Sequence, residues 1–202
     1  MSRLYLYKLT NIDETVPRAP CVRDGILSLA ICKPAIRRTA RPGDLVFGVA
    51  GTTCIPGNPL VYVARVDENL PGHDYYGNSD FAWRADWIYE PHVAGYRLRP
   101  GAGIHTEPAA QRTDLGDAPH FRNARVLVCR EYAYFGQQGP SDYKSLFPRI
   151  AGMVAALMQG HRVNHGDDVR VELLALYHWA LQRSAGTRRA PERARRTSGG
   201  CA

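Results

Sequence analysis

Alternating apolar and polar positions predict short strands in the first two thirds of the chain. The stretch 3–9 (RLYLYKL) is rich in aromatic residues and alternates as a half-buried strand does. Apolar runs of strand length recur at 25–32, 42–51, 59–68 and 124–136. A Pro- and Gly-rich connection separates the middle two of these runs, which predicts a hairpin.

Helical spacing replaces this pattern toward the C-terminus. Residues 146–159 and 167–182 predict two helices. In the second helix, the positions that follow helical spacing and that we expect on or beside the packed face are Val171, Leu174, Tyr177, His178 and Leu181. Strands followed by helices indicate an α+β domain. We expect a small, strongly bent mixed sheet or a barrel, with flanking and C-terminal helices.

Residues 84–122 contain many Gly, Pro, His and charged residues and show little periodicity. A connection of this length in a compact domain is usually functional or partly disordered. We therefore expect a long irregular loop in this part of the chain.

The chain has 202 residues, a net charge of +7 and 45% hydrophobic residues, as an ordinary globular protein does. Residues 183–202 carry six arginines and one glutamate, so this tail supplies 6 − 1 = +5 and leaves 7 − 5 = +2 for the rest. We predict a single domain over residues 1–182 and a basic, disordered tail over 183–202. The overall charge is therefore a weak argument that the domain binds nucleic acid.

No apolar run approaches the roughly 20 residues that cross a bilayer, and the N-terminal residues lack the pattern of a secretory signal. We expect a cytoplasmic protein with no membrane partner, and the oligomeric state stays open. The chain carries no P-loop or GxGxxG motif, and we expect no cofactor. His161 and His165 are four residues apart, but they lie in a predicted loop, so we expect no metal.

The stretch from Lys33 to Arg41 carries unusual charge for a connection between two apolar runs. Pro34 fits the first position of a helix, which would place Lys33, Arg37 and Arg38 on one short element with donors for phosphate groups. Residues four apart share a helix face. We expect Lys33 and Arg37 to face a pocket, with Cys32 and Ile36 packed beneath. The alternative is a solvated connection.

Cys32 permits two interpretations. A thiol beside a cation and a helix start is favoured as a thiolate nucleophile, whereas a cysteine at the end of an apolar strand often only packs in the core. In an enzyme, Lys33 or Cys32 would act as base or nucleophile, with a carboxylate partner among Asp44, Asp86 and Asp114.

Aromatic residues at 132–136 (YAYFG) form a second candidate region. Tyr134 and Phe135 at a strand end are suited to stack on a base. The alternative is that they cap the core. Trp83, Trp87 and Tyr89 are further aromatic candidates in the long loop.

Several sequence blocks occur in an order that resembles the family called nucleotide modification associated domain 2. The blocks are "LSLAICKPAIRRTARPGDLVFG", "LVYVARVDENL", "DYYGNSDF", "DWIY" and "VLVCREYAYFG". The resemblance covers roughly residues 3–140 and rests above all on Cys32-Lys33-Pro34, Ile36-Arg37 and Gly43-Asp44. The chain departs from the family pattern at Asp80, where an arginine is usual, and at 85–89, which lacks the usual Gly and Asn.

The resemblance implies a protein that binds a nucleic-acid base or nucleotide and acts in DNA base modification or in recognition of modified bases. It implies nucleic acid or a nucleotide as partner, and it matches His105 and Asp114 to a histidine and an aspartate of the family. The candidate nucleotide-binding residues are Lys33, Arg37, Arg38, Tyr134, Phe135, Asp86, Tyr89 and His105.

Three alternatives follow for function and fold. One is an enzyme that acts on a nucleobase or nucleotide through Lys33 or Cys32 with a carboxylate such as Asp44. Another is a regulatory or scaffold protein. For the fold, the "GDLVFG" stretch is similar to the Gly-Asp strand of PUA-like, ASCH and EVE barrels, which implies a PUA-like β-barrel.

Overall fold

Successive side chains of the first strand, β1 (Leu4–Leu9), enter two different cores. Leu4 and Leu6 pack in a core shared with the C-terminal helices, whereas Tyr5 and Tyr7 pack in a second core on the opposite face. This alternation is the period of two that a strand with both faces covered requires. The computed structural model describes residues 1–12, 20–158 and 160–185.

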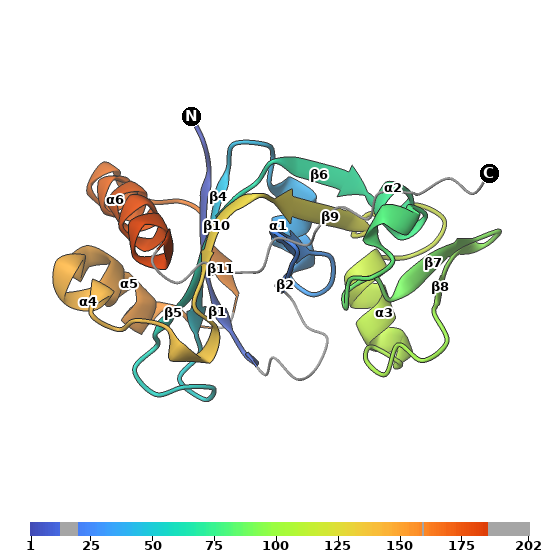
Figure 1. Ribbon diagram of the computed structural model, residues 1–202, viewed down its shortest axis with the longest axis horizontal. Helices are drawn as coiled ribbons and strands as arrows, with labels where there is room; N and C mark the ends of the chain where they lie inside the picture. Colours follow the sequence, from blue (N-terminus) through green and yellow to red (C-terminus); the bar gives the residue numbers. More distant parts are fainter. Residues whose placement is uncertain (13–19, 159, 186–202) are drawn as a thin grey trace, which may run out of the picture.

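The central sheet has five strands in the order β10-β5-β4-β1-β11. Its other members are β4 (Leu45–Ala50), β5 (Leu60–Arg65), β10 (Glu131–Tyr134) and β11 (His161–Arg162). The pair β1–β4 is parallel, and the remaining pairs are antiparallel. One face of the sheet is covered by α4 (Tyr143–Leu146), α5 (Pro148–Ala156) and α6 (Asp167–Ala185) (Figure 1).

A second sheet packs on the opposite face with α1 (Pro34–Thr39). Its order is β2-β3-β9-β6, all antiparallel, and its strands are β2 (Cys21–Arg23), β3 (Ile26–Leu29), β6 (Glu68–Pro71) and β9 (Arg125–Cys129). Strands β9 and β10 follow each other directly but belong to different sheets. The run 124–136 therefore links the two sheets.

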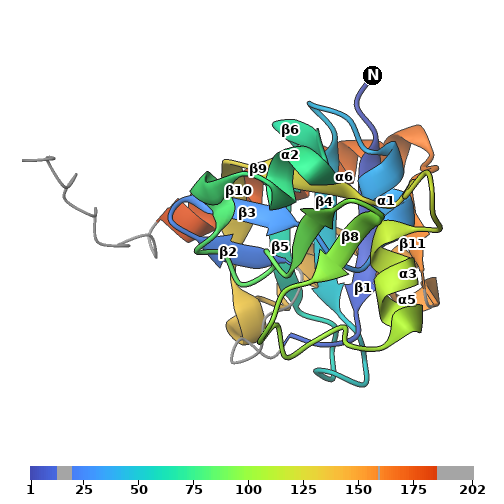
Figure 2. The ribbon, with the colours of Figure 1, turned by 90° about the vertical axis from the view of Figure 1, so that its right-hand side faces the viewer.

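A third group of elements covers the outer side of the second sheet. It consists of α2 (Gly72–Tyr76), the 3-10 turn Ser79–Phe81, the hairpin β7 (Tyr89–His92) and β8 (Gly95–Leu98), and α3 (Pro108–Leu115). A further 3-10 turn, Gly136–Gln138, follows β10. Figure 2 shows α3 beside α1, and the two helices are in contact. This contact brings the segment 84–122 onto the end of β3.

The prediction of an α+β domain with small bent sheets and C-terminal helices is confirmed, as is the hairpin β4–β5. The barrel alternative is wrong, because no sheet formed by the described residues closes on itself. The segment 84–122 is also more regular than expected, since it contains β7, β8 and α3. Its strands are short and partly exposed, so they leave little periodicity in the sequence.

The packed face of α6 matches the predicted one only in part: Tyr177 is buried and Leu181 packs against the same core, as expected. Leu173, Leu176, Tyr177 and Ala180 are buried, whereas Val171 and Leu174 are exposed, as is His178. The helix continues to Ala185, past the expected domain end at 182. The rest of the predicted tail lies outside the described residues. Among the described helices, none combines the length and the apolar composition needed to cross a membrane.

Candidate functional site

The turn between β3 and α1 has an uncommon backbone. Cys32 has φ 55° and Lys33 has φ 45°, so two consecutive residues with side chains adopt the left-handed region. Such values cost about 1 to 3 kcal/mol each for residues other than glycine, and they cluster at functional sites. Pro34 then begins the helix, as predicted. A strand, a strained residue and a helix start also form the turn on which α/β-hydrolases present their nucleophile.

Two charged side chains hold this conformation, one from the distant helix α3 and one from α1 itself. The backbone N–H of Cys32 donates to Asp114 Oδ1 at 2.7 Å. The carbonyl of Cys32 accepts from Arg37 Nε at 2.6 Å. Both polar groups of the Cys32 backbone are therefore satisfied by charged side chains, which explains how the strained conformation persists.

The side chain of Cys32 lies next to a histidine that is itself bound to a carboxylate. Cys32 Sγ is 3.8 Å from His105 Nε2. On the other side of the ring, His105 Nδ1 contacts Asp114 Oδ2 in a short hydrogen-bonded ion pair. Tyr89 Oη donates to the same carboxylate oxygen at 2.8 Å. A thiol, an imidazole and a buried carboxylate in this order have the geometry of a nucleophile, its base and the group that orients the base.

The electrostatics of this group favour a protonated imidazole. The pKa of His105 is raised to about 10, first by its hydrogen bond with Asp114 and then by its hydrogen bond with Cys32, while burial opposes the shift. At neutral pH the ring then carries a proton on each nitrogen. Nε2–H therefore points its donor at the Cys32 sulfur.

A small cavity of about 130 Å³ opens at this group. Its walls are formed by Tyr7, Leu9, Thr10, Asn11, Ile31, Cys32, Lys33 and His105. Pockets for drug-sized ligands measure roughly 300–1,000 Å³, so this cavity has room for about one ring system. Cys32 and Lys33 therefore line the same small space.

Lys33 is held over an aromatic surface. Its Nζ lies 4.9 Å from the centre of the Tyr7 ring and 3.4 Å from the Lys8 carbonyl oxygen. Burial lowers the pKa of Lys33. Tyr7 Oη is 2.8 Å from Tyr62 Oη, and Tyr134 is the cross-strand partner of Tyr62. Tyr134 thus belongs to the tyrosine cluster behind the cavity, although it does not line the cavity itself.

Arg37 does not face a pocket, so that prediction is wrong. Its side chain is 0% exposed, and its guanidinium donates to four backbone carbonyls, those of Cys32, Asn123, Arg125 and Asp114. The four-residue spacing also grouped these residues wrongly: Cys32, which was expected to pack beneath, lines the cavity together with Lys33 before the helix begins, whereas Ile36 and Arg37 are both buried. A guanidinium with every acceptor supplied by the backbone acts as a brace.

The three candidate carboxylates are placed differently. Asp114 joins the thiol and the imidazole, as described above. Asp44 accepts from the backbone N–H groups of Arg3 and Arg41, both at 2.8 Å, and fixes the turn before β4. Asp86 is buried in a separate network with Ser28, Tyr75 and Arg84. No hydrogen bond or ion pair in the described part of the chain joins Asp44 or Asp86 to Cys32 or Lys33.

Of the remaining candidate residues, Tyr89 contacts the Cys32–His105–Asp114 group, and the others lie away from it. Tyr89 contacts Asp114, as given above. Phe135 packs against the core of the C-terminal helices, on the opposite face of the central sheet. Arg38 is exposed at the far end of α1, where its Nη1 donates to Asn123 Oδ1 at 3.3 Å. The expected histidine pair of residues 161 and 165 lies in a different cavity, where His165 Nε2 is 2.7 Å from the Leu4 carbonyl oxygen.

The donor atoms of Cys32, His105 and Asp114 lie within 4.8 Å of one another, a spacing that also suits a metal ion. Three protein ligands and an open position are typical of catalytic zinc. However, both Asp114 oxygens already accept hydrogen bonds from within the protein. The hydrogen-bonded arrangement therefore satisfies these groups without an ion.

Residues 1–197 match the family described as nucleotide modification associated domain 2. The chain belongs to this family. No match was found among curated proteins or among solved structures. In this nucleotide modification associated domain, the residues that carried the resemblance, Cys32-Lys33-Pro34, form the strained turn at the cavity.

Sequence reasoning found parts of this site and missed others. Cys32 and Lys33 were singled out by their position after an apolar run, and His105 and Asp114 by the family resemblance. Tyr7 was not predicted as a cavity residue, because its alternating pattern only indicated a strand. No local signal links Cys32 to His105 and Asp114, which lie 73 and 82 positions further along the chain.

Proposed function

We propose that this protein is a cysteine-dependent enzyme that forms a covalent adduct with a nucleobase or nucleotide. The observation that carries the proposal is the order Cys32, His105, Asp114 at the edge of a small cavity. Membership of the nucleotide modification associated family supplies the substrate class. Of the functions considered from sequence, the enzyme that uses Cys32 is therefore favoured over a module that only binds.

Each residue has a distinct role in the proposed reaction. The Cys32 sulfur forms a bond to an electrophilic ring carbon of the base, and the π electrons of the attacked double bond move onto a ring nitrogen or an exocyclic oxygen. His105 Nε2 gives its proton to that atom, and the reverse step returns the proton and frees the thiolate. Asp114 holds the imidazole in position, and Lys33 supplies a positive charge beside the base.

The first test measures the reactivity of Cys32. We expect iodoacetamide to alkylate Cys32 faster than Cys54 at neutral pH, followed for each thiol by mass spectrometry. His105→Gln should slow alkylation of Cys32 by about 100-fold, the lower range for loss of an acid–base partner. Alkylation of Cys54, which lies in a different cavity, serves as the internal control and should not change.

The second part of the test detects the adduct directly. Wild-type protein incubated with nucleotides that carry modified bases should gain the mass of the base or nucleotide on Cys32, and Cys32→Ser should abolish this gain. An unchanged alkylation rate in His105→Gln together with no adduct would contradict the enzyme. Binding of these nucleotides without an adduct would instead favour the module that only binds. Protection of Cys32 by one equivalent of Zn²⁺ would indicate a metal centre.

A further inference from the structure

A second cavity lies at the opposite end of α1 and is lined by four arginines. It measures about 500 Å³, and its walls are formed by Arg3, Arg38, Thr39, Ala40, Arg41, Pro42, Asn69 and Arg125. No carboxylate belongs to these lining residues. We call the set Arg3, Arg38, Arg41 and Arg125 the arginine groove. Four cations without a negative charge among the lining residues favour an anionic ligand with more than one charge.

The charges of the arginine groove are not neutralised within the described residues. None of its four arginines forms an ion pair there, in contrast to Arg65 and Arg130, which pair with Glu131 and Glu68. Asp44 is the carboxylate next to the groove, but it is buried and accepts hydrogen bonds from two backbone N–H groups. The guanidinium groups are therefore available for phosphate oxygens, which they bind with a planar fork of donors.

Part of the groove is rigidly built. Arg125 donates to the side-chain oxygen of Asn69 at 2.9 Å and to its carbonyl at 2.6 Å. Asn69 Nδ2 donates in turn to the carbonyls of Arg37 and Ala40 at the end of α1. Arg3 Nη1 donates to the Thr39 carbonyl at 3.0 Å. The helix end, β6 and β9 thus position two of the four arginines.

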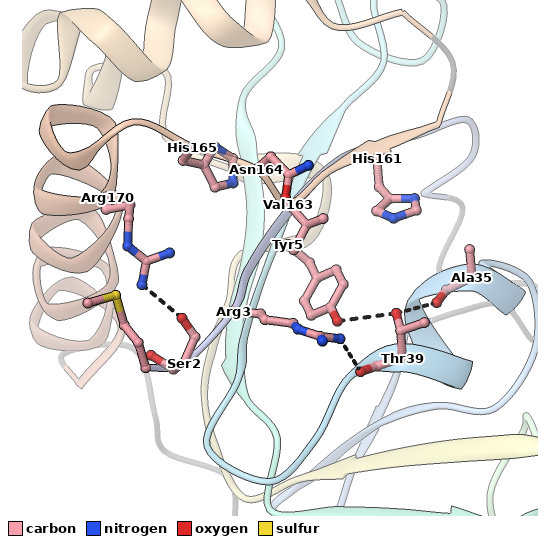
Figure 3. A pocket seen from close by; sticks show the side chains of 11 residues that line it. Ser2, Arg3, Tyr5, Ala35, Thr39, His161, Val163, Asn164, His165 and Arg170 are labelled. Carbon is pink, nitrogen blue, oxygen red and sulfur yellow. Dashed lines mark hydrogen bonds between the residues drawn. The ribbon is translucent and has the colours of Figure 1, made fainter.

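A third cavity lies between the arginine groove, with which it shares Arg3 and Thr39, and the cavity at Cys32, with which it shares no lining residue. Figure 3 shows Arg3 and Tyr5 pointing from β1 toward Thr39 on α1, with His161 on the far side. Arg3, Tyr5 and Tyr7 are alternate residues of the chain at β1 and line the three cavities in turn. From Arg3 to Tyr7 the chain advances about 13 Å. His161, which lines the third cavity, is the cross-strand partner of Tyr7, which lines the cavity at Cys32, so these two cavities are close in space.

We propose that the arginine groove binds the phosphodiester backbone of a single nucleic-acid strand, one base of which enters the cavity at Cys32. This inference rests on the proposed function for the choice of the base-binding end. The cavity at Cys32 has room for a ring system and not for phosphates. A mononucleotide carries its phosphate only one sugar away from the base. Its phosphate does not reach Arg3, which lies about 13 Å along the chain from Tyr7 at the Cys32 cavity.

The strand must be single at the reacting base, because a base inside a duplex cannot enter a closed pocket without leaving the stack. The third cavity is lined by Arg170 as well as His161, and its lining residues include no carboxylate. A backbone that follows α1 from its first to its last turn therefore meets positive or neutral groups throughout. The substrate class is then a polynucleotide rather than a free nucleotide.

The test compares two double variants with the same change in net charge. Arg38→Gln/Arg41→Gln removes two exposed groove arginines, and Arg65→Gln/Arg130→Gln removes two exposed arginines elsewhere. Fluorescence anisotropy with labelled single-stranded DNA or RNA of about ten nucleotides, within the site sizes of single-strand binders, is measured over a salt series. The groove variant should bind about tenfold more weakly, with a salt slope lower by about 1.4, and the control should stay close to wild type.

The remaining arms separate this inference from the proposed enzyme. A mononucleotide should show no difference between the groove variant and wild type. Wild-type affinity and salt slope in the groove variant overturn the groove, whether or not Cys32 forms adducts. Equal weakening in the two double variants also overturns it. Equal affinity for duplex DNA of the same length overturns the single-strand assignment. Groove-dependent binding without any adduct at Cys32 supports the groove and contradicts the enzyme alone.

Discussion

Backbone strain at two residues marks the candidate site of this protein more clearly than any side-chain pattern. Cys32 and Lys33 both adopt left-handed φ values, and hydrogen bonds with Asp114 and Arg37 hold the Cys32 backbone from both sides. The same carboxylate that holds the turn also orients His105. The position of the sulfur and the orientation of its base are therefore set by one buried group.

The strain at Lys33 can be measured by comparing glycine with alanine. Glycine adopts left-handed φ values freely, whereas a residue with a Cβ pays roughly 1 to 2 kcal/mol. We expect Lys33→Gly to be more stable to urea than Lys33→Ala by about 1 kcal/mol. Both changes remove the ammonium, so the difference reports the backbone alone.

Arg38 provides the matched control for this comparison. It lies inside α1, where glycine is less favourable than alanine by about 1 kcal/mol, so the order of stability should reverse. Equal unfolding free energies for the two Lys33 variants would show that the turn is not strained.

At the level of elements, α1 is held in place by Arg37, which the sequence analysis predicted to bind the ligand. The Arg37 guanidinium ties the turn at Cys32 to the end of α3 and to the chain before β9. Its ion pair with Asp114 is long, at 3.9 Å, so the contribution comes mainly from hydrogen bonds to carbonyls. Burial lowers the pKa of Arg37, and the negative groups around it act in the opposite direction.

Removing Arg37 should therefore damage the fold rather than only the binding of a ligand. Arg37→Ala leaves four buried or partly buried carbonyls without this donor and should lower the unfolding free energy by about 3 to 5 kcal/mol, the range for breaking buried charged networks. Arg38→Ala on the exposed side of the same helix should change it by about 0.5 kcal/mol or less. Urea denaturation of both variants measures the difference. Similar stability of the two would contradict the bracing role.

The elements that sequence patterns predicted correctly are those with a single clear period. Strand β1, the hairpin β4–β5 and the start of α1 at Pro34 follow directly from alternation, turn residues and the geometry of proline. Helix α6 is predicted as a helix, but its packed face is predicted only in part, with Tyr177 and Leu181 correct. Val171 and Leu174 are apolar and exposed while Leu173 and Leu176 are buried. A helix that is apolar on several sides does not reveal from its sequence which side packs.

At the scale of the whole molecule, the site depends on contacts that no local pattern specifies. Cys32 comes from the end of β3, His105 from the chain after β8, and Asp114 from α3. These segments meet because the third group of elements packs on the second sheet and α3 contacts α1. Sequence patterns point to Cys32 by its position after an apolar run, and the family resemblance points to His105 and Asp114. Their mutual geometry required the tertiary structure.

This assembly should also give the stability of the protein a characteristic pH dependence. The pKa of His105 rises from 6.5, its ordinary value, to about 10 in the folded protein, so between these values the folded state holds a proton that the unfolded state releases. The contribution of His105 is thus complete below pH 6.5 and is lost as pH rises toward 10. Lys33, whose pKa burial lowers, contributes with the opposite sign. We expect the unfolding free energy of wild type to fall across this window, and His105→Gln to flatten the decline.

The matched control His92→Gln, at an exposed position of β7, should follow wild type in urea denaturation at each pH. A decline of the same size in His105→Gln would mean that the ring does not hold its proton against Asp114.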